Sequence, residues 1–348
     1  MLPEQVETLR SLLLSPDEAN AQLGRALLQG QGLSPELFFA DEISALEEAF
    51  QTQQSFDDWL IQTTRFSRIA AKDMAWGTLP PSLLRLRSVT YLRLENCQIK
   101  QLPADFGAFA ALKWLHLNQN QLTELPLSFG QLALLKFCVL SENKLKKLPP
   151  TFAHLQNLQL LSLSNNQLKH FPEELLALPQ LTSLNFLGNA IRSFPNTLRP
   201  LQKLEKLYLF NNQLRRFPEA VTTLSSLQEL DLSHNKITKI PGNIGQLRCL
   251  QSLQIHSNRL TQLSAAIGQL PVLRVLDVSF NQLTTLPAIL ESMTSLKRLF
   301  LSYNAFKQVP EVLFAMPQLE LIMLSGNRLP AASVEALRAA LPHTEINF

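Results

Sequence analysis

The amino-acid sequence predicts an α/β fold: a horseshoe-shaped solenoid with a parallel sheet on its concave face and an all-α N-terminal cap. Three observations support this prediction. A 23-residue period runs through most of the chain, polar and apolar residues alternate at one place in each period, and an acidic N-terminal segment lacks the period. A fixed period of this length is typical of stacked repeats that share one core.

The period is clearest three residues after each Leu-x-Leu triplet or its equivalent. Asparagine occupies that position in ten units and cysteine in the first, and every step is 23 residues without an insertion. The eleven positions are Cys97, Asn120, Asn143, Asn166, Asn189, Asn212, Asn235, Asn258, Asn281, Asn304 and Asn327.

Each unit begins with a short strand, as in residues 229–231, whose alternation buries one face. Leu115, Leu117 and Leu122 of the second unit point into the core with their counterparts. After the strand the chain turns, and the asparagine amide can satisfy turn backbone groups that the sheet does not pair. Stacked asparagines then form a ladder, in which Cys97 has a structural role.

Two apolar columns predict the outer side of the core. The first contains Phe106, Phe129, Phe152, Leu175, Leu198, Val221, Ile244, Ile267, Leu290 and Leu313. The second contains Phe109, Leu132, Leu155, Leu178, Leu201, Leu224, Leu247, Leu270, Met293 and Met316. Nine units also carry proline after the turn residue, where it ends any strand.

The pattern Leu-Pro-x-x-(Phe/Leu/Ile)-x-x-Leu, as at Leu102-Pro103 and Leu125-Pro126, resembles that of intracellular leucine-rich-repeat proteins of the bacterial type. The resemblance covers about residues 81–348. It extends to Ras-binding scaffolds and to plant intracellular Ras-group-related repeat proteins. It implies recognition of a protein on the concave sheet, without naming the partner.

The chain is expected to divide into three parts. Residues 1–80 form a helical cap, with helix starts at Ser15-Pro16 and Ser34-Pro35. Residues 81–330 form eleven repeats, and residues 331–348 form a C-terminal cap of a helix and a strand. A solenoid exposes its core at both ends, which favours caps. The alternative for residues 1–80 is a separate interaction module.

The net charge also differs between the first part of the chain and the rest. Residues 1–80 carry a net charge of −7 and residues 81–348 a net charge of +10. The three cysteines, an odd number, show no metal-ligand spacing, and no apolar run has the length of a membrane helix. We therefore expect a cytoplasmic protein for which neither a membrane nor nucleic acid is a partner. The sequence leaves the oligomeric state open, with a monomer favoured.

The sequence contains no phosphate-binding loop, no zinc-protease motif and no nucleophile elbow. We therefore expect neither an enzyme nor a cofactor. His234 and His256 lie in adjacent units, with Asp231 and Asp277 nearby, and could converge on a metal. The alternative, which we favour, is four solvated polar side chains, because no ligand spacing is present.

The candidate partner-binding residues lie on the concave sheet. Tyr91, Trp114 and Phe137 occupy one position in three consecutive units, and Arg93 and His116 lie beside them. Aromatic residues with arginine are typical of binding hot spots. The alternative is that the N-terminal helices cover this cluster.

Other candidates lie further along the sheet. Tyr208 and Phe210, with Leu187, form a central apolar patch. Phe300 and Met323, with Phe280 and Tyr303 towards the edge, form a C-terminal one. Between them Glu229, Asp231 and Asp277 form an acidic stretch that could bind a basic segment.

One edge is basic: Lys144, Lys146, Lys147, Lys169, Arg192, Arg215, Arg216, Lys236 and Lys239 follow the asparagines. A solvated, solubilising edge is the favoured interpretation, because the basic residues lack aromatic neighbours for base stacking.

The predicted function is a scaffold that binds a macromolecule on the concave face. The alternative is a recognition or regulatory subunit for an enzyme in trans, such as a small GTPase or its regulator.

Overall fold

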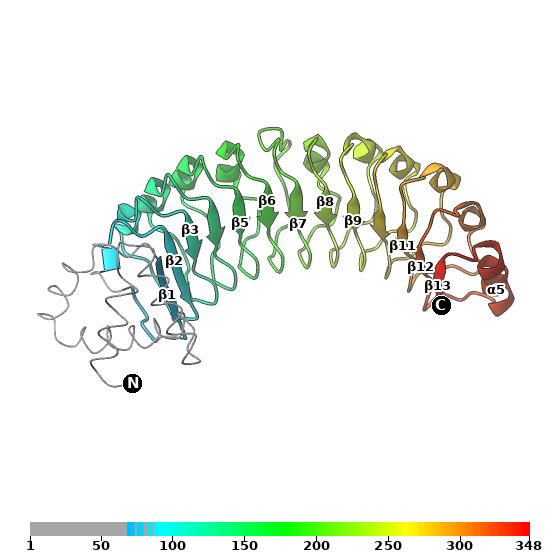
Figure 1. Ribbon diagram of the computed structural model, residues 1–348, viewed down its shortest axis with the longest axis horizontal. Coiled ribbons are helices and arrows are strands. Elements are labelled where there is room, and N and C mark those ends of the chain that lie inside the picture. The colour runs from blue at the N-terminus through cyan, green and yellow to red at the C-terminus, as the bar shows by residue number, and fades with distance from the viewer. Residues whose placement is uncertain (1–67, 74, 80–82, 85) are drawn as a thin grey trace, which may run out of the picture.

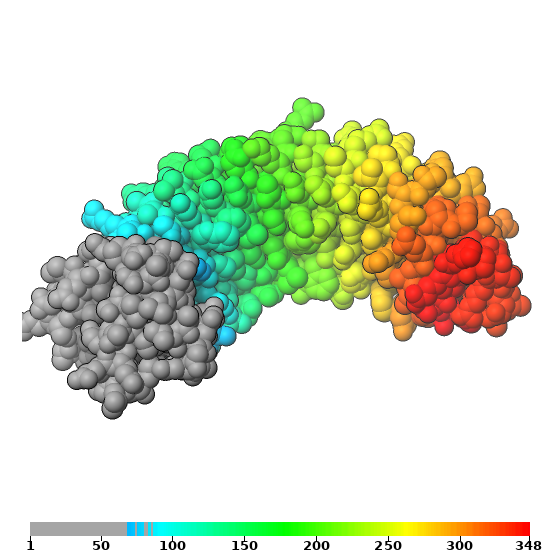
Figure 2. Space-filling view, viewed as in Figure 1, coloured from blue at the N-terminus to red at the C-terminus, as the bar shows by residue number. Residues whose placement is uncertain are grey.

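The computed structural model describes residues 68–73, 75–79, 83–84 and 86–348. They form an arc in which thirteen strands make one sheet in strict chain order (Figure 1). Figure 2 shows the described repeats as one continuous body. The helices expected in residues 1–67 lie outside the described residues. Within the described part, no helix is long and apolar enough to cross a membrane.

All neighbouring strands are parallel, which confirms the predicted sheet and solenoid. Successive strands pair at a step of 23 residues, as in Tyr91 with Trp114 and Trp114 with Phe137. The strands are β1 (Arg68–Lys72), β2 (Tyr91–Glu95), β3 (Trp114–His116), β4 (Phe137–Val139), β5 (Leu160–Ser162), β6 (Ser183–Asn185), β7 (Lys206–Tyr208), β8 (Glu229–Asp231), β9 (Ser252–Gln254), β10 (Val275–Asp277), β11 (Arg298–Phe300), β12 (Leu321–Met323) and β13 (Glu345–Asn347).

The sheet begins upstream of the first expected unit. β1 pairs with β2 in the same 23-residue register, Arg68 opposite Tyr91, although it lies within the segment where only helices were expected. Its inward positions hold Ile69 and Ala71, whereas every later unit has leucine in at least one of these two positions, so β1 lacks the leucine that marks the period.

Both predicted outer columns belong to the core. Every side chain of the first column is fully buried, and no member of the second is more than 4% exposed. Phe106, Phe129 and Phe152 stack in sequence, with ring centroids 5.8 and 5.6 Å apart. Each repeat therefore covers the apolar side of its neighbour, as a solenoid requires.

The outer rim of the arc carries short 3₁₀ helices (Figure 1). They are η2 (Phe106–Ala108), η3 (Leu127–Gln131), η4 (Pro150–His154), η5 (Glu173–Ala177), η6 (Glu219–Thr223), η7 (Gly242–Gln246), η8 (Ala265–Gln269), η9 (Ala288–Ser292) and η10 (Glu311–Ala315).

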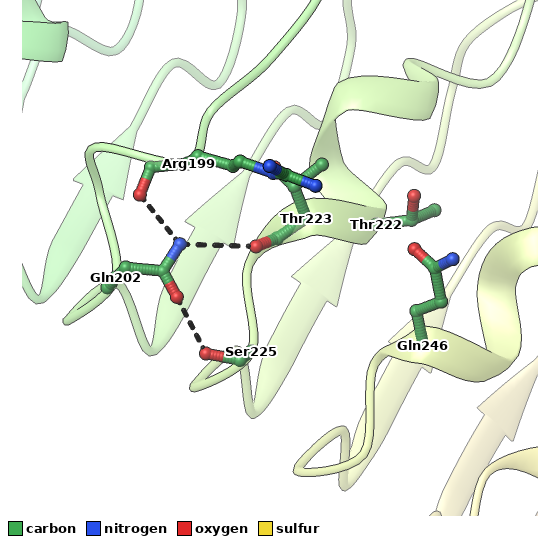
Figure 3. A pocket seen from close by; sticks show the side chains of 6 residues that line it. All are labelled: Arg199, Gln202, Thr222, Thr223, Ser225 and Gln246. Atoms are coloured by element: carbon green, nitrogen blue, oxygen red, sulfur yellow. Dashed lines mark hydrogen bonds between the residues drawn. The ribbon is translucent and has the colours of Figure 1, made fainter.

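The connection between β6 and β7 lacks such a helix. Pro200 stands where the other repeats have the last 3₁₀ residue, and proline provides no N–H for that turn. The Leu198 N–H instead donates to Thr223 Oγ1 of the next repeat, at 3.3 Å. The interruption leaves an open polar hollow of about 630 Å³, lined by Arg199, Gln202, Thr222, Thr223, Ser225 and Gln246 (Figure 3).

The predicted asparagine ladder is confirmed. Asn212 Nδ2 donates to the Phe186 carbonyl of the preceding repeat at 2.9 Å and to the Leu209 carbonyl of its own repeat at 3.1 Å. Its Oδ1 accepts the Ile191 N–H at 2.9 Å. Cys97 is fully buried, and its Sγ lies 3.3 Å from the Glu95 carbonyl oxygen and 3.6 Å from that of Ala71, either of which can accept its one S–H proton.

A second column, which we call the edge column, consists of the residue before each ladder position. In all eleven repeats this residue has a left-handed φ between 51° and 72°. The column is Asn96, Gln119, Glu142, Asn165, Gly188, Asn211, His234, Ser257, Phe280, Tyr303 and Gly326. From Asn96 to Tyr303 each of these residues donates its N–H to a carbonyl of the next repeat, which fixes the backbone whatever the side chain.

The C-terminal end has the helix and strand that were expected there. Helix α5 (Ala331–Ala340) buries Val334 and Leu337 against the last repeat. Strand β13 pairs with β12, and this last step is 24 residues, with Leu321 opposite Glu345.

Candidate functional site

The structure brings the five residues of the predicted N-terminal cluster together on β2, β3 and β4. The rings of Trp114 and Phe137 stack with centroids 3.6 Å apart and an angle of 10° between their planes. Tyr91 does not continue that stack: it packs against His116 of the next strand at 5.7 Å, and the Arg68 guanidinium lies over its ring at 4.6 Å. The cluster therefore consists of two ring pairs, and Trp114 remains 40% exposed.

The charged side chains beside these rings interact mainly with one another. Arg93 Nε donates to Glu95 Oε2 at 2.9 Å, and this bond raises the pKa of Arg93. Burial raises the pKa of Glu95, but the bond from Arg93 opposes it, with a net fall below the ordinary 4.5. Burial, followed by the charge of Arg93, lowers the pKa of His116 below 6.5, so its imidazole is neutral near pH 7.

The central patch differs from the expected apolar one. The Tyr208 hydroxyl donates to Glu229 Oε2 at 2.5 Å, and Lys206 Nζ lies 2.8 Å from Glu229 Oε1. Phe210 packs instead against the imidazole of His234, at 4.7 Å between ring centroids. Tyr208 and Phe210 thus belong to two separate groups, one polar and one aromatic.

Asp231 and Asp277 have a local role that the sequence analysis missed. The Asp231 carboxylate accepts the Ser233 N–H at 2.8 Å, and that of Asp277 accepts the Ser279 N–H at 2.9 Å. Asn185 makes the same contact with the Leu187 N–H. These side chains hold the turn at the end of the strand, as Asx turns do. The signal was present in the sequence as Asp two residues before Ser.

His234 and His256 are adjacent, with ring centroids 5.1 Å apart and perpendicular planes. Among the described residues, no group of three or more His, Cys, Asp or Glu side chains could hold a metal ion. The two imidazoles instead form an aromatic group with Phe210, whose centroid lies 6.1 Å from that of His256.

The C-terminal patch spans β11, β12 and the edge column. Phe300 and Met323 are paired across the two strands and are partly buried. Phe280 and Tyr303 stack with centroids 4.3 Å apart and planes at 11°, and they remain 50% and 53% exposed. Phe300 and Met323 therefore lie on the sheet, and Phe280 and Tyr303 lie at its edge.

The nine side chains of the predicted basic edge are all exposed. Arg192 contacts Gln213, with Nε donating to Oε1 at 2.9 Å. In the rim hollow, Gln202 Nε2 donates to the Arg199 and Thr223 carbonyls, and the Ser225 hydroxyl donates to Gln202 Oε1 (Figure 3). These bonds join two adjacent repeats.

The repeat geometry agrees with comparisons to protein families. A model of a leucine-rich repeat region matches residues 219–341, and leucine-rich-repeat models match residues 138–191 and 111–132. The chain is therefore a leucine-rich-repeat protein. No curated protein sequence matches it.

Solved structures of similar shape include bacterial and plant proteins. A leucine-rich-repeat protein of Leptospira interrogans is 28% identical, with a TM-score of 0.57, over 78% of this chain and 81% of that one. An internalin of Listeria monocytogenes shares the fold at 21% identity and a TM-score of 0.71, over 81% and 80% of the two chains. A plant peptide hormone receptor, solved in complex with RGF2, is 25% identical with a TM-score of 0.65, over 78% of this chain and 45% of the receptor.

Proposed function

We propose that this protein is a scaffold that binds a protein or peptide partner on its sheet face, with the N-terminal cluster as the main contact. One observation carries the proposal: Trp114 is stacked on Phe137 and yet remains 40% exposed on a sheet face beside Arg93. Large aromatic side chains held rigidly at the surface lose little entropy on binding and are enriched in hot spots.

The surroundings of the cluster favour a protein partner. The lowered pKa of His116 and the ion pair of Arg93 with Glu95 reduce the free charge beside Trp114 and Phe137, while the Arg68 guanidinium lies over Tyr91. Interface centres are depleted in charged residues and rich in aromatic ones. The plant peptide hormone receptor in complex with RGF2 adds support, since its fold resembles this one.

The test is capture of partners from the native organism with wild-type protein and the Trp114→Ala variant. Loss of a hot-spot side chain weakens binding by about 30-fold or more, because such residues contribute at least about 2 kcal/mol. Leu321→Ala, at the equivalent position of β12, is the matched control and is expected to retain the partner. Equal capture by the Trp114 variant together with a large fall in its Tm would assign the cluster to internal packing.

The same experiment identifies the partner and so tests narrower roles. Recovery of a small GTPase or its regulator with the wild type alone would make the protein a regulatory subunit acting in trans. A cytoplasmic location is also part of the proposal, supported by an exposed thiol at Cys249. Fractionation of native cells tests it.

A further inference from the structure

The basic edge carries charge that the fold does not use. All nine of its side chains are exposed, and no ion pair joins any of them to a carboxylate of the described residues. In the five repeats concerned, the first, third and fourth positions after each ladder asparagine contain no Asp or Glu. Neighbouring like charges repel one another, so the folded chain gains no stability from this arrangement.

The third position after the ladder asparagine holds a cation in four consecutive repeats, and we call these four side chains the cation row. The row consists of Lys146, Lys169, Arg192 and Arg215. Threonine holds the same position on both sides of the row, at Thr123 and Thr238. Solubility requires charge of both signs spread over the surface, so a row of one sign in neighbouring repeats favours a partner instead.

Backbone pairing fixes the spacing of the cation row. The Arg192 N–H donates to the Lys169 carbonyl at 3.0 Å, and His170 and Ser193 form a parallel bridge. Adjacent repeats are therefore about 4.8 Å apart here, as parallel strands are. Further along each repeat, in the outer core column, the rings of Phe129 and Phe152 are 5.6 Å apart. The cationic side chains thus leave the backbone at intervals of roughly 5 Å.

An α-helix has a matching period. Its pitch is about 5.4 Å, and carboxylates at positions i, i+4, i+7 and i+11 lie on one face of it. These four carboxylates span about 16.5 Å of the helix, and the three steps of the cation row span about 15 Å. Lys and Arg side chains are long and flexible enough to absorb the difference. Each cation of the row can therefore meet one carboxylate of such a helix.

Two other anionic partners fit the cation row less well. No large hydrophobic side chain is exposed among residues 137–251, which contain the row. A single-stranded nucleic acid binds through bases that stack on exposed aromatic rings. A membrane surface is bound most firmly where apolar side chains enter the interface beside the basic ones. The surroundings of the row therefore favour an acidic protein over both.

We propose that the cation row binds an acidic α-helix of a partner protein, with one carboxylate of the helix per repeat. The helix lies along the basic edge, across four repeats, and the other basic side chains of that edge flank it. The site is separate from the N-terminal cluster, and this proposal does not rest on the proposed function.

The test is a fluorescence-anisotropy titration of the full chain, at low ionic strength, with two labelled peptides of identical composition. The aligned peptide carries four Glu residues at i, i+4, i+7 and i+11, and the scattered peptide carries them around the whole helix. The same hydrocarbon staple keeps both peptides helical. The aligned peptide should bind about tenfold more tightly, because exposed ion pairs are individually weak and only this peptide forms four at once. Equal affinity for the two peptides would overturn the proposal.

Two double variants with the same loss of charge separate the cation row from the net charge of the chain. Lys169→Thr/Arg192→Thr removes the middle of the row and should weaken binding of the aligned peptide by about tenfold. Lys100→Thr/Lys307→Thr removes two exposed cations from the same repeat position outside the row and should bind as the wild type does. Both variants should retain the wild-type Tm, since all four positions are exposed. Equal losses of affinity in the two variants would assign binding to net charge and refute the row.

Two further measurements distinguish the partners. Vesicles containing phosphatidylserine and an oligothymidylate are titrated in the same way. Tighter binding of either than of the aligned peptide, lost in Lys169→Thr/Arg192→Thr, would replace the acidic helix and overturn the assignment. Trp114→Ala should leave the affinity for the aligned peptide unchanged, so failure of the N-terminal cluster and failure of the cation row are separable.

Discussion

In each repeat after the first, a single amide side chain satisfies backbone groups of two repeats at once. Asn212 is 6% exposed, and its bonds to Ile191, Phe186 and Leu209 replace water at groups that the turn leaves without sheet partners. Leucines define where the core lies, but these amides define how the chain leaves each strand. The ladder was predictable because its position recurs without an exception after the first unit.

Asn212→Ala should lower the free energy of unfolding by about 2–4 kcal/mol, because each buried backbone group left without a partner costs about 1–3 kcal/mol. Urea denaturation followed by circular dichroism measures the change. Asn211→Gly, at the exposed position next to it, should change the value by less than about 1 kcal/mol. Similar losses for both variants would contradict a special role of the ladder.

Glu229 makes the stability depend on pH. Burial raises its pKa, but the bonds from Lys206 and Tyr208 outweigh burial and hold the pKa below 4.5. A carboxylate with a depressed pKa in the folded state stabilises the fold above its unfolded pKa, and this stabilisation is lost as the pH falls through the folded-state pKa.

Wild type should therefore exceed Glu229→Gln in unfolding free energy at neutral pH, and the two should converge as the pH falls below 4.5. The side chains of Lys206 and Glu229 are 43% and 37% exposed, so solvent screening limits the difference to about 1 kcal/mol. Thermal melts of both proteins across this range measure it. A difference that does not vary with pH would exclude ionisation of Glu229 as its cause.

At the scale of elements, one repeat departs from the others. The segment between β6 and β7 has no 3₁₀ helix, and Thr223 of the following repeat substitutes for the missing turn. Pro200 indicated the missing helix in the sequence. The period of apolar residues did not, because Leu198 and Leu201 continue both columns without change.

Thr223→Val removes the acceptor of the Leu198 N–H, so the segment between β6 and β7 should open more often. Hydrogen exchange of residues 197–201 should accelerate by about fivefold, corresponding to roughly 1 kcal/mol for one hydrogen bond. Thr238→Val, at an exposed position of the neighbouring repeat, serves as the control. Unchanged protection in the Thr223 variant would show that the bond is dispensable.

Strands were predictable where the triplet pattern is strong and were missed where it is weak. β1 has Ile69 and Ala71 at its inward positions, and only its pairing with β2 reveals the repeat. The columns placed Tyr91, Trp114 and Phe137 on one face, but they could not show that Trp114 stacks on Phe137 while Tyr91 turns to His116. Contacts between side chains depend on rotamers, which a period does not encode.

At the scale of the whole molecule, each repeat is stabilised mainly by its contacts with the repeats on either side. Each repeat contacts mainly the repeats before and after it, so a local change affects a limited stretch. Helix α5 packs Val334 and Leu337 on the end of this stack, where the core of the last repeat would otherwise meet water.

Leu337→Asp should therefore loosen the C-terminal end and leave the other end intact. A buried charge in place of a fully buried leucine costs several kcal/mol, and in a solenoid this cost falls on the adjacent repeats. Hydrogen exchange should lose protection in β11 to β13 and retain it in β3 to β6. Uniform loss along the chain would show that the molecule unfolds as one cooperative unit.

The edge column has a consequence for variation among such chains. Its backbone is anchored by one hydrogen bond per repeat, and its side chains range from glycine to tyrosine at nearly the same φ. Changing a residue in this column therefore alters what the surface displays and leaves the scaffold in place, except at Gly188 and Gly326, where an added Cβ atom would come within 2.1 and 2.5 Å of a neighbouring side chain. A combinatorial library confined to the nine other positions of the edge column would yield new binding specificities on an unchanged framework.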